Sequence, residues 1–169
     1  MKNKFKILFL ASIGMLLLVT CKKDPSLNMP NLSVAVIPKV TKDATKDQNV
    51  SFLNLPGFKG SVIVDLYYKD QPQSMDLMVC MNGDVAKTAL VKAGITSYPT
   101  STDFTIANMV GLVPGLTNIS QIKLGDYFKF YVDMTLPDGT IVKGNDPLCG
   151  VSYNIVVCWG RLSRLVWCW

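Results

Sequence analysis

Aspartate supplies every side-chain carboxylate in this chain, because all twelve acidic residues are Asp and the sequence contains neither Glu nor His. Without histidine, neither a Ser-His-Asp triad nor a Cys-His nucleophile can be assembled. Two aspartates could still form a glycosidase pair, with carboxyl groups about 5–5.5 or 6.5–9.5 Å apart. Asp65, Asp76 and Asp133 occupy mid-strand positions, where we expect them to be solvated. We therefore predict no catalytic residue and no enzymatic activity.

The remaining aspartates of interest, Asp126, Asp138 and Asp146, lie in turn sequences, where Asp accepts hydrogen bonds from nearby backbone amides. Calcium held between such turns is the alternative, but no EF-hand spacing supports it. We expect neither a metal nor a cofactor.

Five cysteines could carry thiol, disulfide or zinc chemistry: Cys21, Cys80, Cys149, Cys158 and Cys168. No CxxC occurs, and the spacings do not match common zinc sites. Buried free thiols are the favoured interpretation of the last four. A disulfide from Cys80 to Cys149 or Cys158 stays open.

Three tyrosines, Tyr67, Tyr127 and Tyr131, are candidates for stacking on a glycan because the alternation of the sequence points them away from the predicted core. Tyr127 and Tyr131 would lie about 13 Å apart along one strand, which is too far to hold a single sugar ring. The alternative is that these tyrosines cover the second face of a sheet.

Alternation of apolar and polar residues predicts several strands, and short turn sequences separate them. Residues 84–94 fit either a short helix with Asp84 as N-cap or a strand, and we favour the strand. The pattern predicts an all-β protein with a single antiparallel β-sandwich over residues 50–158. The clearest strands cover residues 61–69, 75–81, 127–136 and 151–157, with a Pro137–Gly139 hairpin turn leading to residues 140–144.

The N-terminal apolar run, Ile7–Val19, is thirteen residues long and follows three lysines. A spanning helix needs roughly 20 apolar residues, so this run predicts a cleaved signal over residues 1–20. The sequence "LVTC" resembles the bacterial lipobox, which implies that Cys21 is acylated and anchors the protein in a lipid bilayer. An ordinary signal peptide is the alternative. Residues 21–49 are polar and turn-rich, and we expect a flexible tether there, with a short strand at residues 33–37.

Although the net charge is +5, its distribution along the chain argues against nucleic-acid binding. Removal of the three signal lysines leaves +2, and Arg161 and Arg164 near the C-terminus account for that remainder. No positive face is expected for phosphates.

Three motifs, "MNGDV", "TDFTIANMVGL" and "LGDYFKFYVDMTLPDGTIVKG", resemble segments of Bacteroidota surface lipoproteins, as "KKD" after Cys21 resembles their export signals. These lipoproteins have Ig-like sandwiches and are associated with SusC/SusD-type glycan import systems, as SusE-like proteins are. The resemblance implies a non-catalytic accessory module for glycan capture or import. It would be lipid-anchored at the outer membrane, on either the cell-surface or the periplasmic face. Its partner would be a polysaccharide or an outer-membrane protein complex. A structural or adhesive protein that binds a protein partner is the alternative.

The C-terminal segment 159–169 departs from that resemblance, since it holds all three tryptophans and both arginines. Three interpretations stay open: a final strand with an aromatic platform, a hydrophobic docking patch, or a change of reading frame or truncation near Cys158. The abrupt change in composition favours the third.

Overall fold

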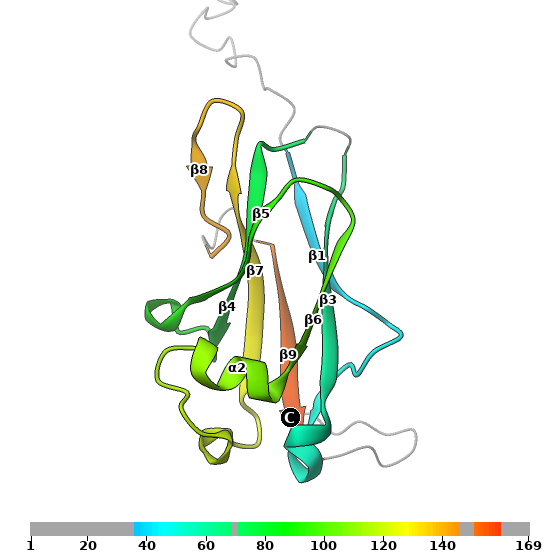
Figure 1. Ribbon diagram of the computed structural model, residues 1–169, viewed down its shortest axis with the longest axis vertical. Coiled ribbons are helices and arrows are strands. Elements are labelled where there is room, and N and C mark those ends of the chain that lie inside the picture. The colour runs from blue at the N-terminus through cyan, green and yellow to red at the C-terminus, as the bar shows by residue number, and fades with distance from the viewer. Residues whose placement is uncertain (1–35, 69–70, 146–150, 160–169) are drawn as a thin grey trace, which may run out of the picture. The chain divides into compact units, whose positions relative to one another are not determined.

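A computed structural model of the chain describes residues 36–68, 71–145 and 151–159 (Figure 1). The described part is mainly β, with two sheets, one of them curled into a half-barrel. The predicted signal, the lipidation residue Cys21, the tether up to Ala35 and the tail beyond Trp159 lie outside the described residues, as do Cys149, Cys168 and Asp146.

The smaller sheet has three antiparallel strands in the order β1-β3-β6. They are β1 (Pro38–Lys42), β3 (Lys59–Leu66) and β6 (Thr100–Thr105). The inward residues of these strands are branched or aromatic, which suits a pleated surface with one buried face. Val62 and Val64 of β3 are fully buried, as the alternation of residues 61–69 predicts.

The larger sheet has six strands, five of which follow the order β2-β9-β7-β4-β5, while β8 pairs with β7. They are β2 (Val50–Ser51), β4 (Ser74–Met81), β5 (Ala89–Ile95), β7 (Tyr127–Thr135), β8 (Ile141–Val142) and β9 (Ser152–Cys158). Within this sheet β2 runs parallel to β9, and the other pairs are antiparallel. The predicted Pro137–Gly139 turn joins β7 to β8, and Gly139 takes the positive φ of +84° that such a turn requires.

Short helices join the strands near one end of the sheets. They are η2 (Phe52–Gly57), η3 (Val85–Lys87), α2 (Ile106–Leu112) and η4 (Ile119–Gln121). Helix α2 lies within "TDFTIANMVGL" and was not predicted. The ambiguous segment 84–94 contains both structures that we considered, since Asp84 caps the single turn η3 and β5 follows it.

One hydrophobic core lies between the two sheets. Phe104 of β6 and Phe130 of β7 meet across it with ring centroids 4.7 Å apart. Along β4, Met75, Leu77 and Val79 are all fully buried, which confirms the predicted inward face of that strand.

The first strand corrects the predicted boundary between tether and sandwich. β1 begins at Pro38, pairs with β3 along its whole length, and buries Val40. The domain therefore starts about a dozen residues before Val50, within the segment that we expected to be a tether. Val36 and Ile37 are not in a strand, so the described part of the predicted strand at residues 33–37 is not one. Turn and proline residues misled the prediction, because a short edge strand tolerates proline at its first position.

The outward face of β7 is covered, which corrects two further expectations. Tyr131 is 2 % exposed and Asp133 is 9 % exposed, although the alternation of β7 places both on the predicted solvated face. The Tyr131 hydroxyl lies 2.7 Å from the Thr88 hydroxyl. Asp133 accepts hydrogen bonds from Lys143 Nζ at 2.7 Å and from the Gly144 amide at 3.0 Å. The loops after β8 and before β5 thus fold over this part of the strand.

The two described cysteines differ. Cys80 is a fully buried free thiol, as we favoured, whereas Cys158 is disulfide-bonded, so the free-thiol interpretation is wrong for Cys158. Because Cys80 is free, the alternative of a disulfide from Cys80 to Cys149 or Cys158 is wrong as well.

The strands define two ends of the domain, to which we give names. The tether end contains Pro38, Leu66, Ser74 and Thr135, which pairing brings to one edge of the sheets. The pocket end contains Met81, Ala89, Tyr127 and Val157. Figure 1 shows β8 toward the first end and α2 at the second. β4 has eight residues, so the two ends lie about 25 Å apart.

Candidate functional site

A turn of three residues, Asn82-Gly83-Asp84, forms one wall of a cavity at the pocket end. Asn82 and Gly83 have positive φ of 55° and 70°, which Asn and Gly adopt at the lowest cost. The Asn82 side chain accepts a hydrogen bond from the Tyr127 amide at 2.9 Å and donates one to Asp126 Oδ1 at 2.8 Å. These bonds fix the end of β4 to the start of β7.

Helix η3 brings a charged pair to the same wall. Asp84 is its N-cap and accepts a hydrogen bond from the Ala86 amide. Lys87, at its end, lies 3.2 Å from the other Asp84 oxygen. Both side chains are about half exposed, so water screens the pair and a ligand can compete with it.

The opposite wall is the loop between α2 and η4. Thr105 and Asn108 form a capping box that starts α2, and Asn118 and Gln121 form a second one at η4. Between them the chain turns at Gly115, where φ is +85°. The turn buries Val113 and Leu116, and these side chains attach the loop to the core.

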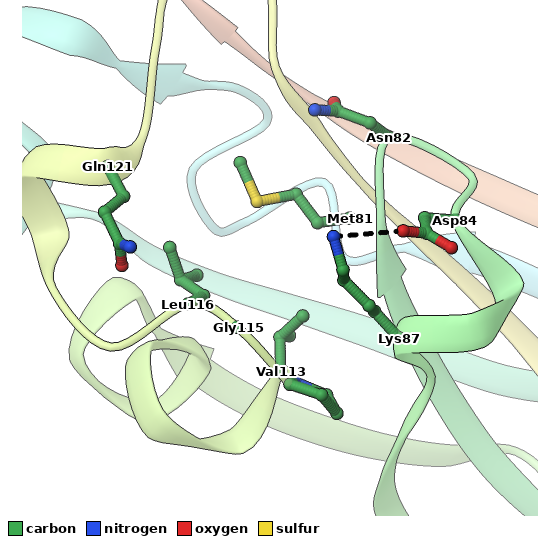
Figure 2. Close-up of a pocket in the computed structure, with 9 residues that line it drawn as sticks. Met81, Asn82, Asp84, Lys87, Val113, Gly115, Leu116 and Gln121 are labelled. Atoms are coloured by element: carbon green, nitrogen blue, oxygen red, sulfur yellow. Dashed lines mark ion pairs between the residues drawn. The ribbon is translucent and has the colours of Figure 1, made fainter.

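The two walls enclose a cavity of about 210 Å³ (Figure 2). Its apolar surface comes from Met81, Val113 and Leu116, and its polar groups come from four other side chains. The lining residues are Met81, Asn82, Asp84, Lys87, Val113, Pro114, Gly115, Leu116 and Gln121. This volume is below the 300–1,000 Å³ range of pockets for drug-sized ligands, so the cavity suits one small chemical group.

Two cavity groups keep hydrogen-bonding capacity for a ligand. Lys87 Nζ has three donor hydrogens, and its ion pair with Asp84 does not occupy all of them. Gln121 Oε1 accepts from the Thr117 and Asn118 amides, so the Nε2 group is the part of the amide that can meet a ligand. An ammonium, a carboxylate and an amide above an apolar floor match a small ligand with several hydroxyl groups and one apolar face.

The three predicted stacking tyrosines do not form one site. Tyr131 is buried, so its ring cannot stack on a ligand at the surface. Tyr67 is 59 % exposed but lies at the tether end, next to the Leu66–Pro38 pair. Tyr127 is half-buried at the pocket end, where its hydroxyl lies directly above Gly83. Of the three, Tyr127 is the one beside the cavity.

The predicted mid-strand aspartates hold loops in place. Asp76 and Asp133 are direct cross-strand partners on β4 and β7, which places their Cβ atoms about 4.5–5.5 Å apart. Asp76, however, accepts the Gly94 amide at a bulge of β5, and Asp133 binds Lys143 and the Gly144 amide. Asp65 accepts the amide of Leu66. None of the three lines the cavity described above.

Within the described ranges, no group of three or more metal-ligating side chains comes together. The turn aspartates behave as predicted where they are described: Asp126 accepts the Lys123 amide, and Asp138 accepts the Thr140 amide. These short-range backbone bonds lower the pKa of Asp138, chiefly through the Thr140 amide. In the part of the chain that the structure covers, no helix is long and apolar enough to span a bilayer.

Sequence reasoning identified Asp84 as a possible N-cap but missed Lys87, Leu116 and Gln121 as members of a site. The capping-box spacings Thr105-x-x-Asn108 and Asn118-x-x-Gln121 were the available signal, because each predicts the start of a helical turn. Together they predict two short helical turns joined by a loop over residues 105–121, but not that this loop lies beside the "NGD" turn.

Comparisons with protein-family models, with curated proteins and with solved structures find no match to this chain.

Proposed function

We propose that this protein is a non-catalytic, lipid-anchored module of the outer membrane whose Ig-like sandwich binds one saccharide unit of a glycan at the pocket end. The lipobox resemblance at Cys21 supports the anchor, and the two facing sheets with their shared core support the sandwich. The lack of His and Glu in the sequence supports a binding role over catalysis.

The cavity between the "NGD" turn and the α2–η4 loop is the observation that carries the glycan assignment. A sugar ring has polar hydroxyl groups at its edge and an apolar C–H face. Met81 and Pro114 offer accessible apolar contact, while Lys87 and Gln121 offer hydrogen bonds to hydroxyl oxygens. About one ring fits, so further affinity would come from repeated units along a polymer.

Affinity electrophoresis of the mature chain with Cys21→Ala, against a panel of host and plant polysaccharides, tests this assignment. We expect one polymer to retard the protein and the double variant Lys87→Met/Gln121→Leu to abolish the retardation. The control is Tyr67→Ser, which changes an exposed residue about 25 Å away at the other end of β4 and should leave retardation unchanged. Absence of retardation across the panel, or a loss confined to Tyr67→Ser, would refute the glycan site.

A protein partner is the second candidate, favoured by an apolar surface at the pocket end. Leu53 is 73 % exposed and Trp159 is 61 % exposed, and the Trp159 ring meets Phe52 edge-on at 6.2 Å. Exposed apolar groups of this kind often mark protein contacts. A pull-down from outer membranes with the wild type and with Leu53→Ser distinguishes the two candidates, because this substitution leaves the cavity intact.

A further inference from the structure

The tether end exposes aromatic and aliphatic side chains that the proposed glycan site does not use. Tyr67 and Tyr68 are both 59 % exposed, Ile141 is 58 % exposed, and Ile37 is 37 % exposed. Four large apolar side chains exposed to water at one end of a small domain are unfavourable in free energy, and contact with another surface would remove that penalty.

Strand pairing places these residues at the same end. The Tyr67 amide donates to the Ile37 carbonyl at 3.1 Å, directly beyond the Pro38–Leu66 pair. Ile141 pairs with Thr135, which in turn pairs with Ser74 at the start of β4. Tyr67 and Tyr68 directly follow β3, and residues 71–73 directly precede β4, so both groups belong to the tether end.

The described part of the chain also begins at this end, and Cys21 precedes it in the sequence. Val36 is the first described residue, and it precedes Ile37 beside Tyr67. Fifteen residues separate Cys21 from Ile37, and a chain of that length spans at most about 55 Å even when fully extended. An acylated Cys21 would therefore keep the tether end close to the bilayer at a high effective concentration, where even a weak contact is populated.

The chemistry of this end suits the headgroup region of a bilayer. Tyrosine concentrates at membrane–water interfaces because its ring is apolar and its hydroxyl stays hydrated. Lys39 Nζ lies 5.7 Å from the centroid of the Tyr67 ring, and a lysine can extend its ammonium group toward phosphates. Asp65 faces Lys39 in the strand register and Asp138 lies in the β7–β8 turn, so apolar contact rather than charge has to supply the affinity.

We propose that the tether end, through Tyr67, Tyr68 and Ile141, rests in the headgroup layer of the membrane that holds Cys21, so that the cavity faces away from that membrane. This proposal rests on the proposed lipid anchor. The pocket end also exposes apolar side chains, Leu53, Val85, Leu124 and Trp159, but it lies about 25 Å farther from the point where the chain leads back to Cys21.

Vesicle binding of the unlipidated mature chain with Cys21→Ala tests the surface without the anchor. The probe is a vesicle of phosphatidylethanolamine and phosphatidylglycerol, and the readout is the partition coefficient from co-sedimentation. Tyr67→Ser/Tyr68→Ser should lower it about tenfold, since two aromatic contacts are lost. The matched control Leu53→Ser/Val85→Ser changes two exposed residues at the pocket end, and its partition coefficient should stay within about twofold of that of the starting protein.

Residues outside the described part are the same in all of these chains, so their own affinity for vesicles cancels in the comparison. No partitioning, or an equal loss in both variants, would overturn the proposal.

A photo-crosslinking amino acid at position 68 then identifies the occupant in the lipidated protein, with position 90 on β5 as control. We expect lipid adducts from position 68 and few from position 90. Protein adducts in place of lipid at position 68 would overturn the proposal and indicate a partner chain or a second copy. Palmitate labelling of wild type and Cys21→Ala reports on the anchor separately, so failure of the anchor and failure of the surface are distinguishable.

Discussion

The tether end and the pocket end of the domain are held together by different kinds of bonds. At the tether end, buried Asp133 binds the Lys143 ammonium and the Gly144 amide, and Gly144 presses on the backbone of β7. At the pocket end, hydrogen bonds of exposed side chains, such as those of Asn82, connect loops around a cavity. The Asp133 carboxylate is nearly buried, although the Lys143 side chain is 63 % exposed, and a carboxylate shielded from water forms stronger hydrogen bonds than an exposed one. We infer that the first end is rigid and tightly packed, while the second can adjust to a ligand.

Among the substitutions that compare the two ends, Gly144→Ala should cause the largest loss in the free energy of unfolding. A Cβ at Gly144 would overlap the Val132 carbonyl oxygen, so the loop after β8 would have to move off β7 and release Asp133. We expect the free energy of unfolding to fall by about 3 kcal/mol or more, measured by urea unfolding. The control is Gly139→Ala in the same hairpin, where the Cβ has open space and the positive φ costs about 1–2 kcal/mol. Equal losses in the two variants would contradict a tightly packed tether end.

Asn82 tests the pocket end. Asn82→Ala removes two side-chain hydrogen bonds and places alanine at a φ of 55°, so we expect a loss of about 2 kcal/mol. Asn82→Gly loses the same bonds without the backbone strain, and about 1 kcal/mol should be lost. A loss as large as that of Gly144→Ala would show that this end is equally rigid.

Tyr131, on the covered face of β7, should make the free energy of unfolding depend on pH. Burial raises the pKa of Tyr131 above its ordinary value of 10.0. The Thr88 hydroxyl donates to the Val85 carbonyl, which leaves the neutral Tyr131 phenol to donate to Thr88. Folding therefore favours the protonated phenol, and this contribution to stability is complete below pH 10 and is lost as the pH rises through the raised pKa.

Tyr131→Phe removes that dependence. At neutral pH the variant should be less stable by about 1 kcal/mol, because the Thr88 hydroxyl loses a partner. About one pH unit above 10, the difference between wild type and variant should shrink. Urea unfolding at both pH values measures it. A gap that stays the same at high pH would mean that the ring is open to solvent, because the phenol would then have the same pKa in the folded and unfolded chain.

The smallest expected effect is the modification of Cys80 in the folded protein, because a reagent in solution cannot reach the buried thiol. Burial raises the pKa of the Cys80 thiol, so it is seldom ionised near neutral pH, and its side chain is fully buried. We expect iodoacetamide to leave it unmodified in the native protein and to modify it fully in urea, as measured by mass spectrometry of the peptide that contains it. Rapid native modification would reveal opening of β4.

The strands were more predictable than the site for a physical reason. Alternation reports burial of one sheet face, which made β3, β4, β7 and β9 recognisable. Tyr131 and Asp133 broke the pattern because loops distant in sequence cover them, and alternation carries no information about such loops. The cavity depends on two loops about thirty residues apart, whose meeting is a property of the tertiary fold. The tether prediction failed at β1, where a five-residue edge strand carries one buried side chain, Val40.

The position of β9 has a consequence for how the protein is made. This late strand lies between β2 and β7, and β2 comes about a hundred residues before it, so the contacts between them are of very high sequence separation. Neither β2 nor the adjacent edge of β7 can be completed until residues 152–158 have been synthesised and are free to pair. A chain that has to cross a membrane in extended form benefits from such an order, because premature folding would stop its passage. For the exported lipoprotein that we propose, the placement of this one strand would delay closure of the large sheet until most of the chain has crossed the membrane.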